Sequence, residues 1–396
     1  MKKRSITDVA VKGKLVFLRV DFNVPLDEKR EITDDTRIKE TLPTLRYLVN
    51  QGAKIVCASH LGRPKADKDP EFSMKPISER LSQLLAQEVL FPGEVIGAKV
   101  EKAKSQLNNG DILLLENLRY LPGETKNEAS FAGELAKHID VFINDAFGAS
   151  HRAHASIQKI TELVPVSVAG FLLEKEIKFL GMATFNPPKN YAVILGGAKV
   201  SDKIPVILNL LDKAQKIFIG GAMAYTFLKA KGIDVGNSRV EKDSIATCLD
   251  ILKKAEEKDV RIFLPVDHVA AIQIEPDVTM RMIKKGESIP PEMMGLDIGF
   301  DTINLYTDEL KNAQLIVWNG PMGVFEIDTF SAGTIEIAKA VASSQVTTII
   351  GGGDTVAAVH KAGVAEFITH ISTGGGASLE FLSGLTLPGI ESLSNA

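Results

Sequence analysis

Short, continuously apolar runs recur along the chain and alternate with stretches of helical periodicity. Runs of this kind occupy, for example, residues 15–18, 112–115 and 191–195. Residues 76–86 and 244–255 instead place apolar side chains at the spacing of one helix face. Strands that are apolar on both faces and alternate with helices indicate parallel sheets covered by helices.

The apolar runs end differently in the two halves of the chain. In the first half they lead into arginine or histidine, whereas in the second half they lead into glycine or a polar turn. Ligands of open α/β sheets bind outside the carboxyl ends of the strands. One half therefore offers side-chain cations, which suit a compact anion, and the other offers bare backbone, which suits a polyphosphate. The first interpretation is an enzyme that moves phosphate between the halves.

The chain is long enough for two domains. Its 396 residues exceed the size at which one core usually keeps growing. Residues 172–180 are amphipathic and helical, and Asn186-Pro-Pro-Lys stops that helix because proline lacks an amide donor. We therefore predict an α/β protein of two Rossmann-like domains, each a parallel sheet covered by helices, joined by a linker helix and hinge at 171–190.

Composition narrows the class of protein. The chain is 45% hydrophobic and 24% charged, and its net charge of -4 argues against nucleic acid as a partner. No run approaches the roughly 18 apolar residues of a membrane helix, and the first residues lack the apolar stretch of a signal peptide. Cys57 and Cys248 form no metal or redox motif, so we interpret them as buried structural thiols. We expect a cytoplasmic protein without a membrane partner.

The segment 346–359 reads as strand, glycine turn and helix. Gly351, Gly352 and Gly353 would let backbone amides approach a phosphate, with the helix dipole adding to the attraction. Asp354 would reach a phosphate-bound Mg²⁺, or would serve only as a helix N-cap. A second run at 372–378 repeats the pattern, with a plain flexible loop as the alternative. The chain has neither a Walker segment nor GxGxxG, which weighs against a nicotinamide dehydrogenase.

Two lysines follow the strand at 191–195. Lys199 and Lys203 are four residues apart, so on a helix both would face one polyphosphate; a solvated cationic turn is the alternative. Gly220, Gly221 and the segment 318–326 could shape a nucleoside pocket, with Glu326 accepting from ribose hydroxyls. We interpret Trp318 as a core residue.

Basic side chains cluster at the strand ends of the first half. The group consists of Arg37, His60, Arg63, Arg119, His151 and Arg152. Each alone would be read as a surface charge, but together on one sheet edge they would repel each other unless an anion joins them. Asp21 and Asn23 could accept from a substrate hydroxyl. We leave Arg19 aside as the partner of a nearby carboxylate, and we do not interpret His151 and His154 as a metal site because no third ligand is near.

The ordered set of motifs resembles phosphoglycerate kinase. The motifs are Arg19-Val-Asp-Phe-Asn-Val-Pro, Ser59-His-Leu-Gly-Arg-Pro, Glu116-Asn-Leu-Arg, Asn144-Asp-Ala-Phe-Gly, His151-Arg-Ala-His-Ala-Ser, Gly196-Gly-Ala-Lys-Val-Ser-Asp-Lys, Trp318-Asn-Gly-Pro, Gly351-Gly-Gly-Asp-Thr and Ser372-Thr-Gly-Gly-Gly-Ala-Ser. The resemblance covers nearly the whole chain. It implies a glycolytic kinase that reversibly transfers a phosphoryl group between 1,3-bisphosphoglycerate with ADP and 3-phosphoglycerate with ATP.

The resemblance also implies roles for single residues. Those implied to hold the glycerate substrate are Asp21, Asn23, Arg37, His60, Arg63, Arg119 and Arg152. Those implied to hold Mg-ADP or Mg-ATP are Gly197, Lys199, Lys203, Gly220, Gly221, Asn319, Pro321, Glu326, Gly351, Gly352, Gly353, Asp354 and Thr355. The implied contacts to the transferred phosphoryl are Arg37, Lys199 and the amides of Gly353 and Gly376, and Asp354 is the implied Mg²⁺ ligand.

The resemblance further implies domains at 1–170 plus 381–396 and at 191–380, because the family's C-terminal segment returns to the first domain. We expect a monomer. Ala222 stands where the family has a third glycine, and Ala149-Ser150 stands where Thr-Ala is usual. The alternative from another class is a non-catalytic nucleotide- or anion-binding protein on the same scaffold. Such a protein would be expected to lose Arg37, Lys199 or Asp354, and all three are present.

Overall fold

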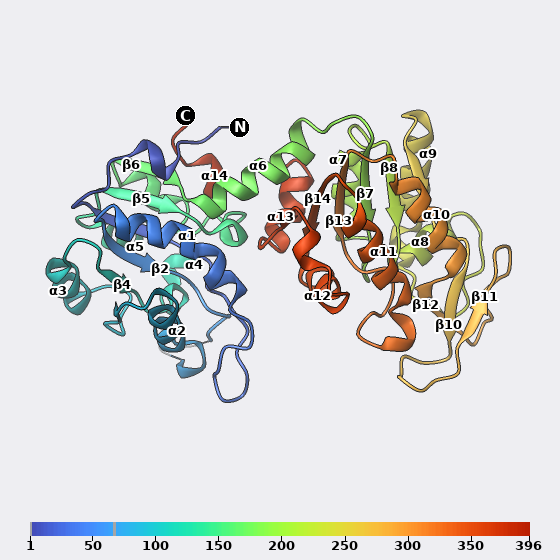
Figure 1. Ribbon diagram of the computed structural model, residues 1–396, viewed down its shortest axis with the longest axis horizontal. Coiled ribbons are helices and arrows are strands. Elements are labelled where there is room, and N and C mark those ends of the chain that lie inside the picture. Colours follow the sequence, from blue (N-terminus) through green and yellow to red (C-terminus); the bar gives the residue numbers. More distant parts are fainter. Residues whose placement is uncertain (1, 66–68) are drawn as a thin grey trace. The chain divides into compact units, whose positions relative to one another are not determined.

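The computed structural model describes residues 2–65 and 69–396 (Figure 1). The chain forms two compact units, the first made of Met1–Lys178 and Thr386–Ala396 and the second of Phe179–Leu385. Each unit contains a six-stranded sheet whose strand pairs are all parallel, with helices packed against it. The predicted α/β class with two parallel sheets is therefore confirmed.

The first sheet has the strand order β3-β4-β2-β1-β5-β6. Its strands are β1 (Leu15–Arg19), β2 (Lys54–Ala58), β3 (Val89–Leu90), β4 (Ile112–Leu114), β5 (Val141–Asn144) and β6 (Val166–Ala169). The helices of this unit are α1 (Thr36–Asn50), α2 (Lys75–Leu85), α3 (Ala98–Gln106), α4 (Pro122–Thr125), α5 (Ala129–Ala136) and α14 (Pro388–Glu391). Arg19 pairs with Ala58 and with Asn144, so the central strands end at one level. The residues that follow them share one edge.

The second sheet has the order β15-β14-β13-β7-β8-β9. Its strands are β7 (Tyr191–Leu195), β8 (Lys216–Ile219), β9 (Arg261–Phe263), β13 (Leu315–Asn319), β14 (Thr347–Gly351) and β15 (His370–Ile371). The helices of this unit are α7 (Ile204–Leu210), α8 (Met223–Ala230), α9 (Ile245–Glu257), α10 (Phe300–Leu310), α11 (Ala332–Ser343), α12 (Gly353–Lys361) and α13 (Gly376–Leu382). Asn319 pairs with Leu195 and with Gly351, so the glycine turns also share one edge.

The second unit also contains a small antiparallel sheet that the sequence did not predict. Its strand order is β11-β10-β12, with β10 at His268–Ala271, β11 at Arg281–Ile283 and β12 at Met294–Ile298. Two of the three residues of β11 are exposed, so this strand lacks the continuous apolar character of the parallel strands. Single-turn 3₁₀ helices lie at Ile6–Asp8, Pro70–Phe72, Leu118–Tyr120, Phe147–Ala149, Lys159–Glu162, Lys242–Ser244, Asp328–Phe330 and Ala365–Phe367.

Helix α6 spans Phe171–Phe185 and ends directly before Asn186-Pro187, as the proline signal predicts. The division between the two units falls inside this helix. The apolar tail packs on the first unit: Leu387 and Ile390 are buried, and the Asn144 Nδ2 donates to the carbonyl of Gly389 at 2.8 Å. Figure 1 shows both chain ends at this unit. No helix of the described residues is long and apolar enough to cross a membrane.

Candidate active site

The second sheet has its topological switch point between β7 and β13, and the backbone crowds there. From β7 the chain proceeds to β8 on one side, whereas β13 and β14 lie on the other. A Cβ atom on Gly196 would lie 2.1 Å from the carbonyl oxygen of Pro321, and one on Gly320 would lie 2.2 Å from that of Gly196. Only glycine fits such contacts, so the crevice where ligands bind in this fold is walled by bare backbone.

The triple-glycine segment forms the predicted strand, turn and helix. Strand β14 ends at Gly351, Gly352 is the N-cap with φ of +90°, and α12 begins at Gly353. Asp354 lies exposed in the first turn and caps nothing, so its interpretation as a mere N-cap is wrong. Its carboxylate makes no hydrogen bond or ion pair with other described residues. It is therefore available to a ligand.

The second glycine run leads into a helix as well. Gly375 has φ of +52° and precedes α13, which begins at Gly376. The run is tied to the sheet because the Ser372 amide donates to the Ile350 carbonyl at 2.7 Å. The run is thus anchored at its first residue and continues into a helix. Gly353 and Gly376 line one crevice of about 390 Å³, which places the first turns of α12 and α13 on the same cavity.

The two lysines line that crevice, but they do not share a helix. Lys199 is exposed in a loop, and α7 begins only at Ile204 with Pro205 in its first turn. The predicted helical pairing is wrong because the chain first turns through Gly197, whose φ is +93°. Lys203 is buried and donates to the Asn319 Oδ1. Burial lowers the pKa of Lys203 to about 8, although Asp202 and Asp354 act in the opposite direction.

A second cavity of about 270 Å³ adjoins the crevice and shares Gly197, Pro321 and Asp354 with it. Ile274, Met294 and Leu296 contribute apolar walls, and the exposed Glu326 lies on its lining. An apolar pocket beside a glycine-lined crevice suits a nucleoside that carries phosphates.

Two of the predicted nucleotide residues, Gly220 and Thr355, hold the backbone around the crevice in place. A Cβ atom on Gly220 would lie 2.3 Å from the Met322 sulfur, so close packing explains this glycine. The buried Thr355 accepts from the Gly320 amide at 2.6 Å. Trp318 is fully buried, as its interpretation as a core residue predicts.

In the first unit, Asp21 connects two of the predicted cations. The Arg37 Nη1 donates to the Asp21 Oδ2 at 2.9 Å, and the His60 Nδ1 lies 4.0 Å from the Asp21 Oδ1. Burial alone would raise the pKa of Asp21, but the neighbouring cations, Arg37 first and Arg19 after it, act in the opposite direction and that pKa is lowered. Asp21 is therefore an ionised acceptor.

Arg119 and Arg152 belong to the same layer of basic side chains at the strand ends as Arg37 and His60. They are close enough for their positive charges to repel each other. The Arg119 Nη1 donates to the Gly62 carbonyl at 2.7 Å, while its Nε is buried without a partner. Burial and the positive charges of Arg152 and Arg19 lower the pKa of Arg119 to about 10. Arg63 is exposed, and no contact among the described residues joins it to this group. Guanidinium groups that repel each other at a strand-end edge favour an anion between them.

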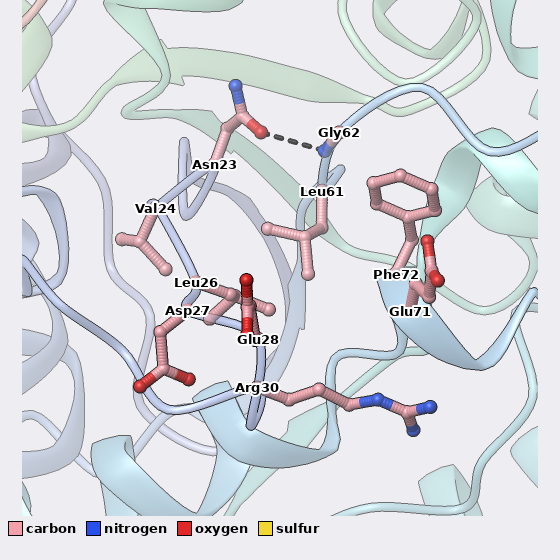
Figure 2. A pocket seen from close by; sticks show the side chains of 10 residues that line it. All are labelled: Asn23, Val24, Leu26, Asp27, Glu28, Arg30, Leu61, Gly62, Glu71 and Phe72. Carbon is pink, nitrogen blue, oxygen red and sulfur yellow. Dashed lines mark hydrogen bonds between the residues drawn. The ribbon is translucent and has the colours of Figure 1, made fainter.

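A cavity of about 450 Å³ beside this layer has a different character (Figure 2). Asn23 is the only predicted glycerate residue among its lining residues, and its Oδ1 accepts from the Gly62 amide at 2.8 Å. Asp27, Glu28 and Glu71 place carboxylates around it against the single guanidinium of Arg30. An anion is therefore better served by the arginine layer than by this pocket.

Comparisons with known proteins show the family of the chain. The model of the family described as "Phosphoglycerate kinase" matches residues 6–385. The chain belongs to the phosphoglycerate kinase family. It is 54% identical to phosphoglycerate kinases from Koribacter versatilis and Thermosipho africanus, over 100% of this chain and 100% and 98% of theirs. Structures from Coxiella burnetii and Pyrococcus horikoshii superpose with TM-scores of 0.90 and 0.84 at 37% and 36% identity. They cover 98% and 99% of this chain and 98% of each of those chains.

Membership of the phosphoglycerate kinase family confirms the predicted fold, function and enzyme class. The protein is a glycolytic kinase, and the nicotinamide-dehydrogenase alternative is thereby excluded. Ala222, the departure from the family's glycine, lines the nucleoside cavity and precedes α8.

Sequence reasoning missed the group beneath the basic layer. Arg19 and Glu124 are both fully buried, with the Arg19 Nη2 at 4.0 Å from the Glu124 Oε1. The expectation that Arg19 has a carboxylate partner is therefore right. Glu124 itself gave no signal, because a glutamate in a Pro-Gly-Glu segment reads as a surface charge. Burial of an arginine on a strand was the one available sign that a carboxylate must lie nearby.

Proposed function

We propose that this kinase divides its two ligands between the two units. The arginine layer of the first unit holds 3-phosphoglycerate or 1,3-bisphosphoglycerate through Asp21, Asn23, Arg37, His60, Arg63, Arg119 and Arg152. The glycine-walled crevice of the second unit holds ADP or ATP, with the base in the adjoining apolar cavity and Glu326 at the ribose.

The contrast in charge between the two strand-end edges carries this proposal. At the first edge, neighbouring guanidinium groups depress the pKa of Arg119 to about 10, with burial as the larger cause. At the second edge, glycines and helix N-termini line the crevice. A compact dianion satisfies the first arrangement, whereas a long polyphosphate needs the close backbone approach of the second.

The residues present fit a magnesium ion that arrives with the nucleotide. Mg²⁺ is usually bound through one or two carboxylates plus substrate phosphates and keeps several waters. Asp354 lies on the crevice lining, and its exposed carboxylate makes no hydrogen bond or ion pair with the other described residues. The ion would neutralise phosphate charge, and Lys199 and Lys203 would add ammonium donors on the same wall.

The reaction then needs the substrate held by the first unit to meet the nucleotide held by the second. In the direction of ATP use, a carboxylate oxygen of 3-phosphoglycerate attacks the γ-phosphorus while the bond to the leaving oxygen of ADP breaks. In-line transfer needs reacting atoms about 3–3.5 Å apart. We propose that hinge bending within 171–190 brings them together. Arg37, Lys199 and the amides of Gly353 and Gly376 would then meet the moving phosphoryl.

A coupled assay tests the transfer step of this proposal. Protein, 3-phosphoglycerate and Mg-ATP are mixed, and ADP formation is followed with and without each substrate. We expect ADP only when both are present. Binding of both ligands without turnover would favour the alternative, a non-catalytic binding protein on this scaffold. The cytoplasmic location and the monomeric state stay predictions, which cell fractionation and light scattering can check.

A further inference from the structure

Arg19, the buried arginine beneath the basic layer, contacts a ring nitrogen of His60. The Arg19 guanidinium is fully buried, and each of its nitrogens contacts a different acceptor. The Nε donates to the Ser156 Oγ at 2.8 Å, the Nη1 donates to the Val20 carbonyl, and the Nη2 lies 3.3 Å from the His60 Nδ1. Because it is fully buried, Arg19 itself is out of reach of a substrate.

The direction of each hydrogen bond in this group is determined by chemistry. Arginine carries only donors, so the Ser156 oxygen must accept from Arg19 and direct its own proton elsewhere. That proton goes to the Glu124 Oε1 at 2.7 Å, and the Ser156 amide donates to the Glu124 Oε2 at 3.0 Å. Glu124 thereby holds the hydroxyl in the orientation that Arg19 requires.

The same reasoning applies at the other end of the guanidinium. The His60 Nδ1 faces a donor that cannot become an acceptor, so this nitrogen must present its lone pair. A proton there would leave a buried Arg19 N–H without a partner, which is costly. The Asp21 carboxylate cannot hold such a proton in a hydrogen bond, because its Oδ1 is 4.0 Å away.

We infer that Arg19, held by Glu124 and Ser156, fixes His60 as the neutral tautomer with its proton on Nε2. Arg19 is thus a positioning residue, and His60 can only donate to a ligand. With the proposed function, the His60 Nε2–H would donate to an oxygen of the glycerate substrate.

The charges around His60 agree with a neutral ring. Burial lowers its pKa well below the usual value, and the positive charges of Arg19, Arg119 and Arg37 act in the same direction. Only the Asp21 carboxylate opposes them. His60 should therefore stay neutral at the pH near 6.5 at which an ordinary histidine takes up its proton.

Nuclear magnetic resonance of the whole unliganded protein, with ¹⁵N-labelled histidines, tests the inference directly. The His60 signals are assigned by their loss in His60→Gln. We expect a protonated Nε2 and a pyridine-type Nδ1 that stay unchanged as the pH falls through about 6.5. A protonated Nδ1, or a ring that titrates near pH 6.5, overturns the inference.

Two further variants separate positioning from mere structure. Glu124→Gln keeps the shape of Glu124 but loses the charge, and Arg19→Lys removes the fork that reaches His60. In a folded variant we expect His60 to populate both tautomers. The KM for 3-phosphoglycerate should rise about tenfold, because one charge-assisted hydrogen bond is lost. The KM for Mg-ATP should stay unchanged. The matched control is Arg46→Lys. Arg46 is an exposed arginine of α1 that donates to the Leu84 carbonyl, so this variant should change neither the His60 tautomer nor the KM for 3-phosphoglycerate.

The outcomes distinguish this inference from the proposed function. A fixed Nε2–H tautomer in a protein that fails to bind 3-phosphoglycerate would leave the inference intact and remove the proposed ligand. Binding of 3-phosphoglycerate by a protein whose His60 carries its proton on Nδ1 would do the reverse. If Arg19→Lys fails to fold, the wild-type tautomer and Glu124→Gln still decide the matter.

Discussion

The two sheets follow the same plan, yet their carboxyl-end edges are built from different parts of the chain. In the first unit the strands lead to side chains, and the layer consists of guanidinium groups over a buried support of Arg19 and Glu124. In the second unit the strands lead to glycines that pack so closely that a Cβ atom on Gly196 or Gly320 would collide with the facing backbone. Under the proposed function, one parallel sheet recognises an anion through charge and the other through backbone shape.

The difference also appears in how each edge holds one of its cations, the half-buried Arg119 and the buried Lys203. Arg119 keeps a pKa of about 10 although burial and like charges lower it, so it stays charged at neutral pH. Lys203 is lowered to about 8 by burial and bonds to the Asn319 side chain. The first edge carries a permanent positive charge, whereas the second adjusts its charge more easily. The following variants test this contrast between the two edges, from the largest expected effect to the smallest.

Lys199→Ala should lower kcat about a hundred- to a thousandfold, with only modest changes in the binding of either ligand. An interaction made mainly in the transition state lowers turnover more than affinity. Lys199→Arg should not rescue the loss, because a planar fork replaces a compact ammonium. Steady-state kinetics with direct titration of each ligand measure both effects. Near-normal turnover of Lys199→Ala would remove this residue from the transferring step.

Arg152→Ala and Asp354→Ala should each lower the affinity for a different ligand by about ten- to a hundredfold. This is the usual effect of losing a hydrogen bond to a charged group. Arg152→Ala should affect 3-phosphoglycerate, and Asp354→Ala should affect Mg-ATP. Calorimetry of both variants with both ligands gives four affinities. Loss of nucleotide affinity in Arg152→Ala, with 3-phosphoglycerate unaffected, would reverse the assignment of the units.

Gly320→Ala should destabilise the second unit by about 1–3 kcal/mol, because the added methyl group overpacks the switch point. Its φ of +101° adds strain for any other residue. Gly353→Ala is the matched control for folding, since a Cβ atom there meets nothing within 4 Å. Thermal and urea unfolding compare the two variants. Equal stabilities would show that the close backbone approach is unimportant.

Asp145 should give an effect on stability that depends on pH and is smaller per pH unit. It is fully buried and accepts from the Leu173 amide at 3.0 Å, and burial raises its pKa to about 7. Because the folded state binds this proton more tightly than the unfolded state, stability should fall as pH rises from about 4 to 7. The slope should be at most about 1.4 kcal/mol per pH unit.

Urea unfolding across that range tests the Asp145 prediction. Asp145→Asn should remove this contribution, whereas Asp277→Asn at an exposed position should behave like the wild type. A wild-type protein and an Asp145→Asn variant whose stabilities run parallel with pH would show that Asp145 does not titrate there.

Sequence patterns predicted what short-range chemistry determines. The turn at Gly351–Gly353 could be read because three glycines between an apolar run and a helix leave few alternatives. The pairing of Lys199 with Lys203 was predicted wrongly, because helical spacing was assumed where Gly197 turns the chain and Pro205 sits in the first turn of a later helix. The β10–β12 sheet and the role of Glu124 depend on long-range packing, which leaves no local pattern. Where Arg63 lies relative to the other cations was likewise not readable.

The most direct test of the divided site is hydrogen–deuterium exchange of the whole protein with each ligand alone. The account predicts that 3-phosphoglycerate slows exchange only after β1, β2, β4 and β5, in the segments around His60, Arg119 and Arg152. It predicts that Mg-ATP slows exchange only in the turns around Gly197, Asn319 and Gly353. Protection of the glycine turns by 3-phosphoglycerate alone, or of the arginine layer by Mg-ATP alone, would contradict the account.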